Sequence, residues 1–231
     1  MIVLGIIPAR GGSKSIPLKN IKPLCRKPLL AYTIESALQS NSINRLVVST
    51  DHPQIAQIAQ EYGSEVIMRP AELATDDATT ESVLLHVLEV LENRDKYIPD
   101  VVLTLEPTAP FRTVNLIEKC INIFNLSDAD SVIGVVESRS CYGKIVDKQF
   151  EFLFPGQLRR RQLREPLYKE CSTIYATRVS TLRNRNSVLG EKLYALIVPE
   201  EEAIDINTNL DFKIAEALMQ AKVSAKEEIH D

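Results

Sequence analysis

The opening stretch of the chain constrains its fold most strongly. It begins with an apolar, mostly β-branched run over residues 2–7, IVLGII. Such a run is typical of a strand buried on both faces, at the centre of a parallel sheet. The run leads directly into residues 8–14, PARGGSK, where two adjacent glycines are bracketed by Arg10 and Lys14. Because glycines let backbone N–H groups approach a ligand closely, this strand and loop predict a phosphate site.

The loop alone leaves another interpretation open, since a glycine pair after a strand often makes only a turn. Two common nucleotide-binding motifs are absent. No glycine directly precedes Lys14, as the P-loop pattern requires, and the glycines do not follow the G-x-G-x-x-G spacing. The sequence therefore favours neither a Walker-type NTPase nor a dinucleotide-binding enzyme.

The composition is that of a globular protein with a sizeable core. The chain has 231 residues, of which 45% are hydrophobic and 25% charged, enough for one large α/β domain or a core with a smaller lobe. Its formal net charge of −4 argues against a general nucleic-acid binder. No apolar run has the roughly 18 residues needed to span a bilayer, and we expect no signal peptide and no membrane association by a spanning helix.

The cysteines and histidines are scattered. The four cysteines form no C-x-x-C pair, and the three histidines are isolated. We therefore expect neither a disulfide framework nor a structural zinc site, and a reducing cytoplasmic location fits best.

Strand-like and helix-like segments alternate along the first half of the chain. The pattern predicts strands over residues 46–51, 65–68, 100–105 and 131–136, with helices over 28–38 and 53–62, after the polar loop 75–80 and after Thr113. This alternation predicts the α/β class, as a three-layer sandwich around a mostly parallel, Rossmann-like sheet. Ligands of such sheets lie at the carboxyl ends of the strands. We therefore expect the polar strand ends at 10–14, 49–51 and 106–112 to face one cleft.

The alternation breaks over residues 137–175. Phe150, Phe152 and Phe154 alternate as in a strand or hairpin edge with one apolar face, and a basic run follows at 159–164. We interpret 137–175 as an excursion from the core that serves a dimer contact, a substrate lid or both. A run of arginines is commonly only a solvated surface, so its role stays open.

The chain then returns to the core. Residues 172–177 and 193–198 are predicted strands, and Thr208 with Asp211 matches the capping-box pattern at the start of a last helix. We expect Ile214, Ala215 and Leu218 to form the apolar face of that helix, and the polar tail from residue 221 to fray.

Read in order, these motifs resemble those of the acylneuraminate cytidylyltransferases, which make CMP-sialic acid and related CMP-nonulosonic acids. The matching stretches are residues 7–14 with 19–20, 49–51, 69–76, 106–112, 174–175 and 203–211. The resemblance implies one nucleotidyltransferase domain over 1–231, with 137–175 inserted in it and reaching the partner of a homodimer. It also implies that the anomeric hydroxyl of a 3-deoxy-2-keto sugar acid attacks the α-phosphorus of CTP and releases pyrophosphate, with Mg²⁺ or Mn²⁺ as cofactor.

The resemblance also implies roles for single residues. The catalytic residues would be Arg10, Lys14 and Asp205. The nucleotide would be bound by Ala9, Arg10, Gly11, Gly12, Ser13, Lys14, Asn20, Arg69, Thr79 and Thr80. The sugar acid would be bound by Glu106, Lys144, Arg160, Lys169 and Tyr175. The metal would be held by Asp205 and Asn207.

Three departures from the family pattern stand out. Asn207 replaces the second aspartate of the usual Asp-x-Asp; its amide oxygen can coordinate Mg²⁺ but contributes no charge. Glu106 replaces a glutamine that typically faces the sugar, which predicts a preference other than N-acetylneuraminate. Lys169 replaces an arginine and loses bidentate carboxylate recognition, and Cys171-Ser172 replaces Asn-Gly. The last two departures lie on the sugar side.

Three rival functions remain at the level of the sequence. One is a 3-deoxy-manno-octulosonate cytidylyltransferase, whose opening loop usually differs from this one. Another is a CTP-binding protein in which Asn207 marks a decayed metal site with little turnover. The third, a nucleic-acid-binding module that uses the arginine run, is disfavoured by the net charge.

Overall fold

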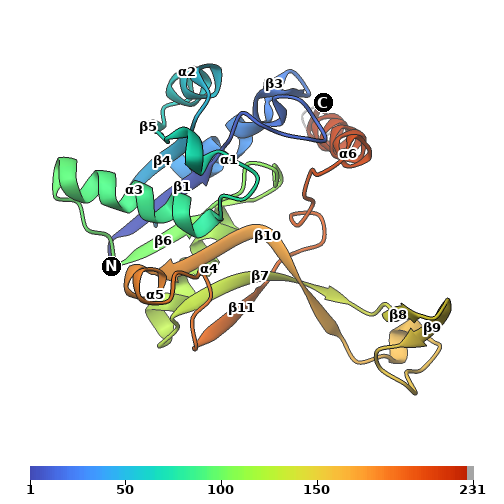
Figure 1. Ribbon diagram of the computed structural model, residues 1–231. Coiled ribbons are helices and arrows are strands. Elements are labelled where there is room, and N and C mark those ends of the chain that lie inside the picture. The colour runs from blue at the N-terminus through green and yellow to red at the C-terminus, as the bar shows by residue number, and fades with distance from the viewer. Residues whose placement is uncertain (228–231) are drawn as a thin grey trace.

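The computed structural model describes residues 1–227, and its centre is a seven-stranded sheet with the order β11-β7-β10-β6-β1-β4-β5 (Figure 1). The strands are β1 (Val3–Pro8), β4 (Arg45–Thr50), β5 (Glu65–Met68), β6 (Val101–Thr104), β7 (Ser131–Ser138), β10 (Leu167–Arg178) and β11 (Leu193–Ile197). β10 pairs antiparallel with β6 and with β7, and the other neighbours pair in parallel. The predicted α/β class with a mostly parallel sheet is confirmed.

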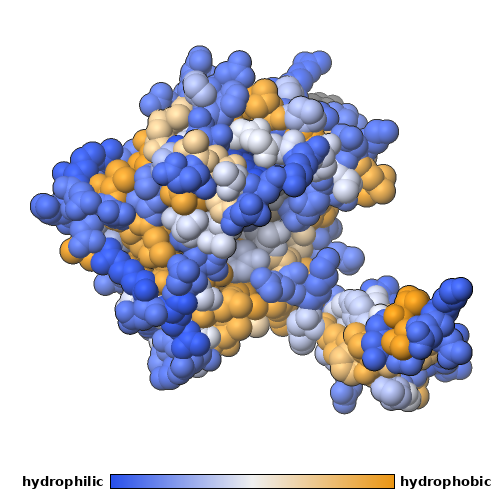
Figure 2. Space-filling view, in the orientation of Figure 1, coloured by the Kyte–Doolittle hydropathy of each residue, from blue (hydrophilic) through white to orange (hydrophobic). Residues whose placement is uncertain are grey.

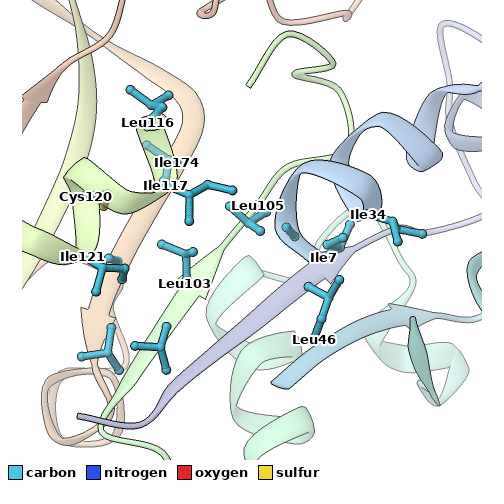
Figure 3. Packing of buried hydrophobic residues seen from close by; sticks show 14 of the residues in the cluster. Ile7, Ile34, Leu46, Leu103, Leu105, Leu116, Ile117, Cys120, Ile121 and Ile174 are labelled. Atoms are coloured by element: carbon cyan, nitrogen blue, oxygen red, sulfur yellow. The ribbon is translucent and has the colours of Figure 1, made fainter. Parts of the chain in front are cut away.

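Helices cover both faces of the sheet. They are α1 (Leu29–Leu38), α2 (Pro53–Glu61), α3 (Thr80–Asp95), α4 (Val114–Leu126) and α5 (Val179–Arg185), whereas α6 (Asn209–Glu227) packs in a separate cluster with Leu24 and Leu29. Apolar residues of α1, α2 and α4 pack on one face, where Ile7 of β1, Ile34 of α1 and Leu103 of β6 lie in one cluster (Figure 3). Those of α3 and α5 pack on the other face with Leu4 and Ile6 of β1. β1 therefore buries both of its faces, as the opening run predicts.

The polar starts of two helices agree with the sequence. Thr113 accepts a hydrogen bond from the backbone N–H of Leu116 (3.2 Å) and caps α4. Thr208 Oγ1 accepts one from the Asp211 N–H (3.2 Å), and Asp211 Oδ2 accepts one from the Thr208 N–H (2.7 Å). The predicted capping box is therefore formed, and it fixes the turn into α6.

The predicted face of α6 is wrong in part. Phe212 and Ala215 are buried against Ile16, Leu24 and Phe111, whereas Ile214 and Leu218 are 45% and 37% exposed. Spacings of three and four residues allow either of two adjacent helix faces, and the large ring of Phe212 selects the buried one. The helix also continues from residue 221 to Glu227, where fraying was predicted. Residues 228–231 of the predicted tail lie outside the described residues.

Part of the region 137–175 projects from the main body, whereas residues 167–175 belong to β10 of the central sheet. The hairpin of β8 (Gly143–Val146) and β9 (Gln149–Phe152) lies beyond the ends of the long β7 and β10 strands, apart from the helices (Figure 1). The Phe150 and Phe152 rings meet edge to face with centroids 5.1 Å apart, and both rings are exposed, as is Phe154. Figure 2 shows hydrophobic residues on the surface of this projecting lobe.

Short elements complete the chain. β2 (Pro23–Leu24) and β3 (Lys27–Pro28) form a small hairpin, and three 3-10 turns lie at Lys19–Ile21, Ala71–Leu73 and Arg161–Leu163. Over residues 1–227, none of the helices combines the length and the apolarity required to traverse a bilayer.

Candidate active site

A cleft with a volume of about 630 Å³ opens at the carboxyl ends of β1 and β6. Segments far apart in the sequence line it: Arg10 and Ser13 after β1, Glu106 after β6, Tyr175 of β10, and Asp205 before α6. The pairing of β10 with β7 shifts its register between Glu170 and Tyr175, so a bulge in β10 lies at the cleft wall. Of the polar strand ends expected here, Arg10 and Glu106 do face the cleft, whereas Ser49 is buried.

The glycine loop is anchored to the end of β4. The backbone N–H of Ala9 donates to the Ser49 carbonyl (2.9 Å), and that of Gly11 donates to Asp51 Oδ1 (2.9 Å). A Cβ at Gly11 would lie 2.8 Å from the His52 ring, so the start of α2 excludes a side chain there. A Cβ at Gly12 would meet no atom within 4 Å, so this glycine faces open space.

The two cations of the loop converge on one carboxylate. Arg10 Nη1 lies 2.8 Å from Asp76 Oδ1, and Lys14 Nζ lies 2.7 Å from Asp76 Oδ2. Lys14 does not line the cleft, but its ammonium group contacts Asp76, which does line it. Positive charge is therefore fixed at the edge of the cleft beside the glycines.

Asn20 and Arg69 lie buried beneath this loop. Asn20 Nδ2 donates to the Arg10 carbonyl (3.0 Å), and its Oδ1 has no hydrogen-bond partner in the described chain. Arg69 donates to the Ser49 carbonyl (2.5 Å) and to the Leu73 carbonyl (3.2 Å). Burial lowers the pKa of Arg69 to about 10. Arg69 thus supports the strand end while it adds positive charge to the cleft wall.

Thr79 and Thr80 line the cleft at the start of α3. Thr79 is the cap of this helix, because its Oγ1 accepts a hydrogen bond from the Ser82 N–H (3.2 Å). The Thr80 hydroxyl makes no hydrogen bond within residues 1–227 and is available to a ligand.

The opposite wall of the cleft is acidic. The half-buried carboxylate of Glu106 makes no hydrogen bond or ion pair with the described residues. Desolvation by burial raises the pKa of Glu106 to about 7; nearby Asp205 also raises it, while Arg112 opposes the rise. Tyr175 Oη donates to Glu170 Oε1 (2.9 Å) across the bulge of β10. Burial, followed by this hydrogen bond, raises the pKa of Tyr175.

Only one of the two carboxylate oxygens of Asp205 makes hydrogen bonds within the described residues. Its Oδ2 accepts hydrogen bonds from Ser172 Oγ (2.9 Å) and Asn207 Nδ2 (2.7 Å), whereas its buried Oδ1 has no partner in the described chain. Within residues 1–227, no three His, Cys, Asp or Glu side chains gather into a metal-binding cluster made by the protein alone. One carboxylate and one amide fit Mg²⁺, which is usually bound by one or two carboxylates and completed by substrate phosphates and water. Asp211, which bonds the Asn207 and Thr208 N–H groups, acts as the helix cap.

Three predicted sugar-binding residues do not lie in the cleft of their own chain. Lys144 belongs to the β8–β9 hairpin, where its Nζ lies 3.4 Å from Glu151. Arg160 and Lys169 are exposed on the same excursion and are absent from the cleft wall. Their role in binding the sugar therefore stays a prediction, and it requires a second chain or a movement of the excursion.

The cleft also contains a charged residue to which we assigned no role from the sequence. Lys19 Nζ donates to the Ile206 carbonyl (2.7 Å), and burial lowers its pKa despite the nearby Asp205 and Glu106. Its place in the Lys19-Asn20 motif was the available signal. Arg112, by contrast, is fully buried and donates to Glu106 O, Thr173 O and Thr33 Oγ1, so it supports the floor rather than facing the cleft.

Comparison with known proteins identifies the family of this chain. A family model described as cytidylyltransferase matches residues 4–210. The chain is 33% identical to the CMP-N,N'-diacetyllegionaminic acid synthase of Legionella pneumophila, over 97% of this chain and 99% of that one. It is 31% identical to an N-acylneuraminate cytidylyltransferase of Escherichia coli, over 99% of this chain but only 54% of the relative.

A solved structure agrees at the level of the fold. The structure of CMP:2-keto-3-deoxy-manno-octonic acid synthetase complexed with CTP superposes with a TM-score of 0.71 and covers 96% of this chain and 100% of its own, at 19% identity. The family match over most of the chain, together with a relative from Legionella pneumophila that is similar over nearly its whole length, shows that this protein belongs to the cytidylyltransferase family and is a nucleotidyltransferase.

Proposed function

We propose that the protein transfers the cytidylyl group of CTP to the anomeric hydroxyl of a nonulosonic acid, a 3-deoxy-2-keto sugar acid, and releases pyrophosphate. The observation that carries the proposal is the division of one cleft into two halves. A glycine loop with two cations forms one half, and Glu106, Tyr175 and Asp205 form the other. The relatives named for CMP-legionaminic acid synthesis and N-acylneuraminate cytidylyl transfer support this substrate class.

The cationic half suits a triphosphate. Arg10 and Lys14 can neutralise the charge that builds on the leaving pyrophosphate, and the open backbone at Gly12 allows a phosphate to come close. Thr80, whose hydroxyl is available at the start of α3, lies where it can bind the nucleoside. Arg10 and Lys14 both contact the single carboxylate of Asp76, so the two cations lie close enough together to engage one phosphate chain.

Asp205 would hold Mg²⁺ through its free Oδ1, with the carbonyl oxygen of Asn207 as a second ligand after rotation of the amide. The ion would supply charge neutralisation on the α-phosphate. Ser172 holds the Asp205 carboxylate through Oδ2, so Oδ1 is the oxygen that would bind the ion. Mn²⁺, which also accepts oxygen ligands, is expected to substitute.

Glu106 would set the sugar preference. A carboxylate that faces an anionic sugar acid repels it unless the sugar brings a positive charge or the carboxyl is protonated. We expect Glu106→Gln to shift the ranking of substrates toward N-acetylneuraminate. The comparison is kcat/KM for N-acetylneuraminate and for a nonulosonic acid that carries a free amine, in both proteins; an unchanged ratio would show that Glu106 does not contact the sugar.

The proposal includes a cytoplasmic homodimer. The exposed aromatic face of the β8–β9 hairpin gives a second copy of the chain an apolar surface to cover. A dimer would let Lys144, Arg160 and Lys169 of one chain approach the cleft of the other. CTP and the sugar acid are the substrates, and neither nucleic acid nor membrane is needed for this function.

Two other functions remain as outcomes of one test. Purified protein would be incubated with CTP, Mg²⁺ and a panel of nonulosonic acids and 3-deoxy-manno-octulosonate, with pyrophosphate and CMP-sugar measured together. The proposal predicts pyrophosphate equal to CMP-nonulosonate. A preference for the octulosonate would favour the second enzyme class. If the wild type forms no product and Asn207→Asp restores activity, the result would favour a decayed metal site.

A further inference from the structure

Asp76 occupies the position on the two loop cations that an anionic ligand would take. Its Oδ1 lies 2.8 Å from Arg10 Nη1 and its Oδ2 lies 2.7 Å from Lys14 Nζ, so each carboxylate oxygen contacts one cation. Arg10 Nη1 also donates to the Thr75 carbonyl (3.0 Å). Hydrogen bonding from Lys14, and next from Arg10, lowers the pKa of Asp76, so the carboxylate remains charged at neutral pH.

This contact contributes little to holding the fold together. The side chains of Arg10, Lys14 and Asp76 are 36%, 79% and 46% exposed, and exposed ion pairs are weak. Removal of the pair would leave no buried charge unpaired. A role in structure alone therefore does not explain why both cations converge on one carboxylate.

The segment that carries Asp76 has few other attachments. Residues 71–74 form a 3-10 turn tied to Arg69 through the Leu73 carbonyl, and Thr79 begins α3 as its cap. Between them, within the described residues, Thr75 Oγ1 donates to the nearby Glu72 carbonyl (3.3 Å), and the other hydrogen bonds and ion pairs of residues 75–78 to the rest of the protein run to Arg10 and Lys14. A ligand that takes these cations would therefore release the segment without breaking the core.

We propose that Asp76 is an internal competitor, which holds Arg10 and Lys14 in the nucleotide-free enzyme and is displaced by the triphosphate. The inference rests on the proposed function only in assigning these two cations to phosphate. A triphosphate carries several negative charges and outcompetes one carboxylate. Because CTP must displace Asp76 before it binds, the competition would lower the affinity for CTP. When Asp76 returns to the cations after the reaction, it would speed the release of pyrophosphate.

The neighbouring Asp77 provides a matched control. It lies in the same segment, is exposed, and makes no ion pair within residues 1–227. Asp76→Asn and Asp77→Asn remove the same charge from nearly the same place. Loss of one negative charge should strengthen anion binding equally in both variants. Loss of a competitor for Arg10 and Lys14 should strengthen anion binding further in Asp76→Asn alone.

The test is calorimetric titration of the full chain with inorganic tripolyphosphate and, separately, with CTP. We expect Asp76→Asn to bind both ligands about two- to fivefold more tightly than Asp77→Asn does, in line with the strength of exposed ion pairs. In an Arg10→Ala/Lys14→Ala background, Asp76→Asn should have no such effect.

Equal affinities of the two asparagine variants would overturn the inference. Weaker binding by Asp76→Asn would also overturn it and would make Asp76 a residue that positions the cations around the bound phosphate. The tripolyphosphate arm separates this inference from the proposed function. Tripolyphosphate binding that responds to Asp76→Asn, in a protein that forms no CMP-sugar, would support the competitor and contradict the substrate assignment.

Discussion

The side chains of Lys14 and Arg10 are exposed or partly exposed, so we expect them to contribute little to the stability of the fold. Lys14 is 79% exposed, and its ion pair with Asp76 lies at the protein surface. We predict that Lys14→Ala lowers kcat/KM for CTP about tenfold to hundredfold, the loss expected for one charge-assisted hydrogen bond, at an unchanged free energy of unfolding. Arg10→Ala should act similarly. Steady-state kinetics and urea unfolding provide the measurements.

Lys213→Ala is the matched control for this prediction. Lys213 is exposed on α6 and does not line the cleft. Its removal deletes one positive charge from the surface and should leave kcat/KM within about twofold of the wild type, as expected for a distant, screened charge. Normal turnover of Lys14→Ala and Arg10→Ala would contradict the assignment of these cations to phosphate.

Glu106 should couple stability to pH. Its pKa of about 7 in the folded protein lies above the ordinary glutamate value of 4.5, so the folded state binds more protons than the unfolded state between these pH values. The free energy of unfolding should therefore fall as pH rises from about 4.5 through 7. Glu106→Gln lacks this titration and should become more stable relative to wild type by about 1–3 kcal/mol between pH 5 and pH 8.

Urea unfolding at several pH values, with a chelator present, measures this difference. A stability gap between Glu106→Gln and wild type that stays constant with pH would contradict a desolvated carboxylate in the cleft wall.

Some residues of the cleft could be predicted from the sequence and others could not. The glycine loop and Glu106 could be placed at the cleft because each directly follows a strand. Arg112 also follows β6, yet it is buried, since its guanidinium finds three acceptors beneath the cleft. The converse holds for Lys19, whose contact with the Ile206 carbonyl joins residues 187 positions apart. No local pattern encodes such a contact.

At the scale of elements, hydrophobic periodicity predicted most strands and helices but not how the strands pair. Strand β10 returns antiparallel between β6 and β7, which allows its bulge to face the cleft. The position of β10 depends on the path of residues 137–175. In the sequence, this region is visible only as a break in the alternation of strands and helices. The face of α6 was misjudged for a related reason, because its contacts with Leu24 and Phe111 come from distant segments.

The start of α6 provides a prediction at this scale. Asp211 accepts hydrogen bonds from the backbone N–H groups of Asn207 and Thr208. Asp211→Ala should lower the free energy of unfolding by about 1 kcal/mol, the usual cost of a lost cap. Asp205→Asn should instead reduce turnover and its dependence on Mg²⁺. Urea unfolding and magnesium titration of activity separate the two aspartates; loss of Mg²⁺ dependence in Asp211→Ala would make Asp211 a metal ligand.

At the scale of the whole molecule, the β8–β9 hairpin projects from the main body and leaves an aromatic face exposed. Its exposed Phe150 and Phe152 should be covered in a homodimer. We predict that the wild type sediments as a dimer and that the double variant Phe150→Ser/Phe152→Ser sediments as a folded monomer. Analytical ultracentrifugation at micromolar concentration tests this. A monomeric wild type, or a variant that stays dimeric, would contradict the assignment of this surface.

The central claim is that one cleft holds CTP at the glycine loop and the sugar acid at the acidic wall. A crystal structure of the protein with CTP, Mg²⁺ and a nonulosonic acid tests it most directly. We predict the triphosphate on Arg10 and Lys14 with Asp76 displaced, the metal on Asp205, and the sugar's anomeric hydroxyl in line with the α-phosphorus on the Glu106 side. Nucleotide bound elsewhere, or a triphosphate that does not contact Arg10 and Lys14, would contradict the account.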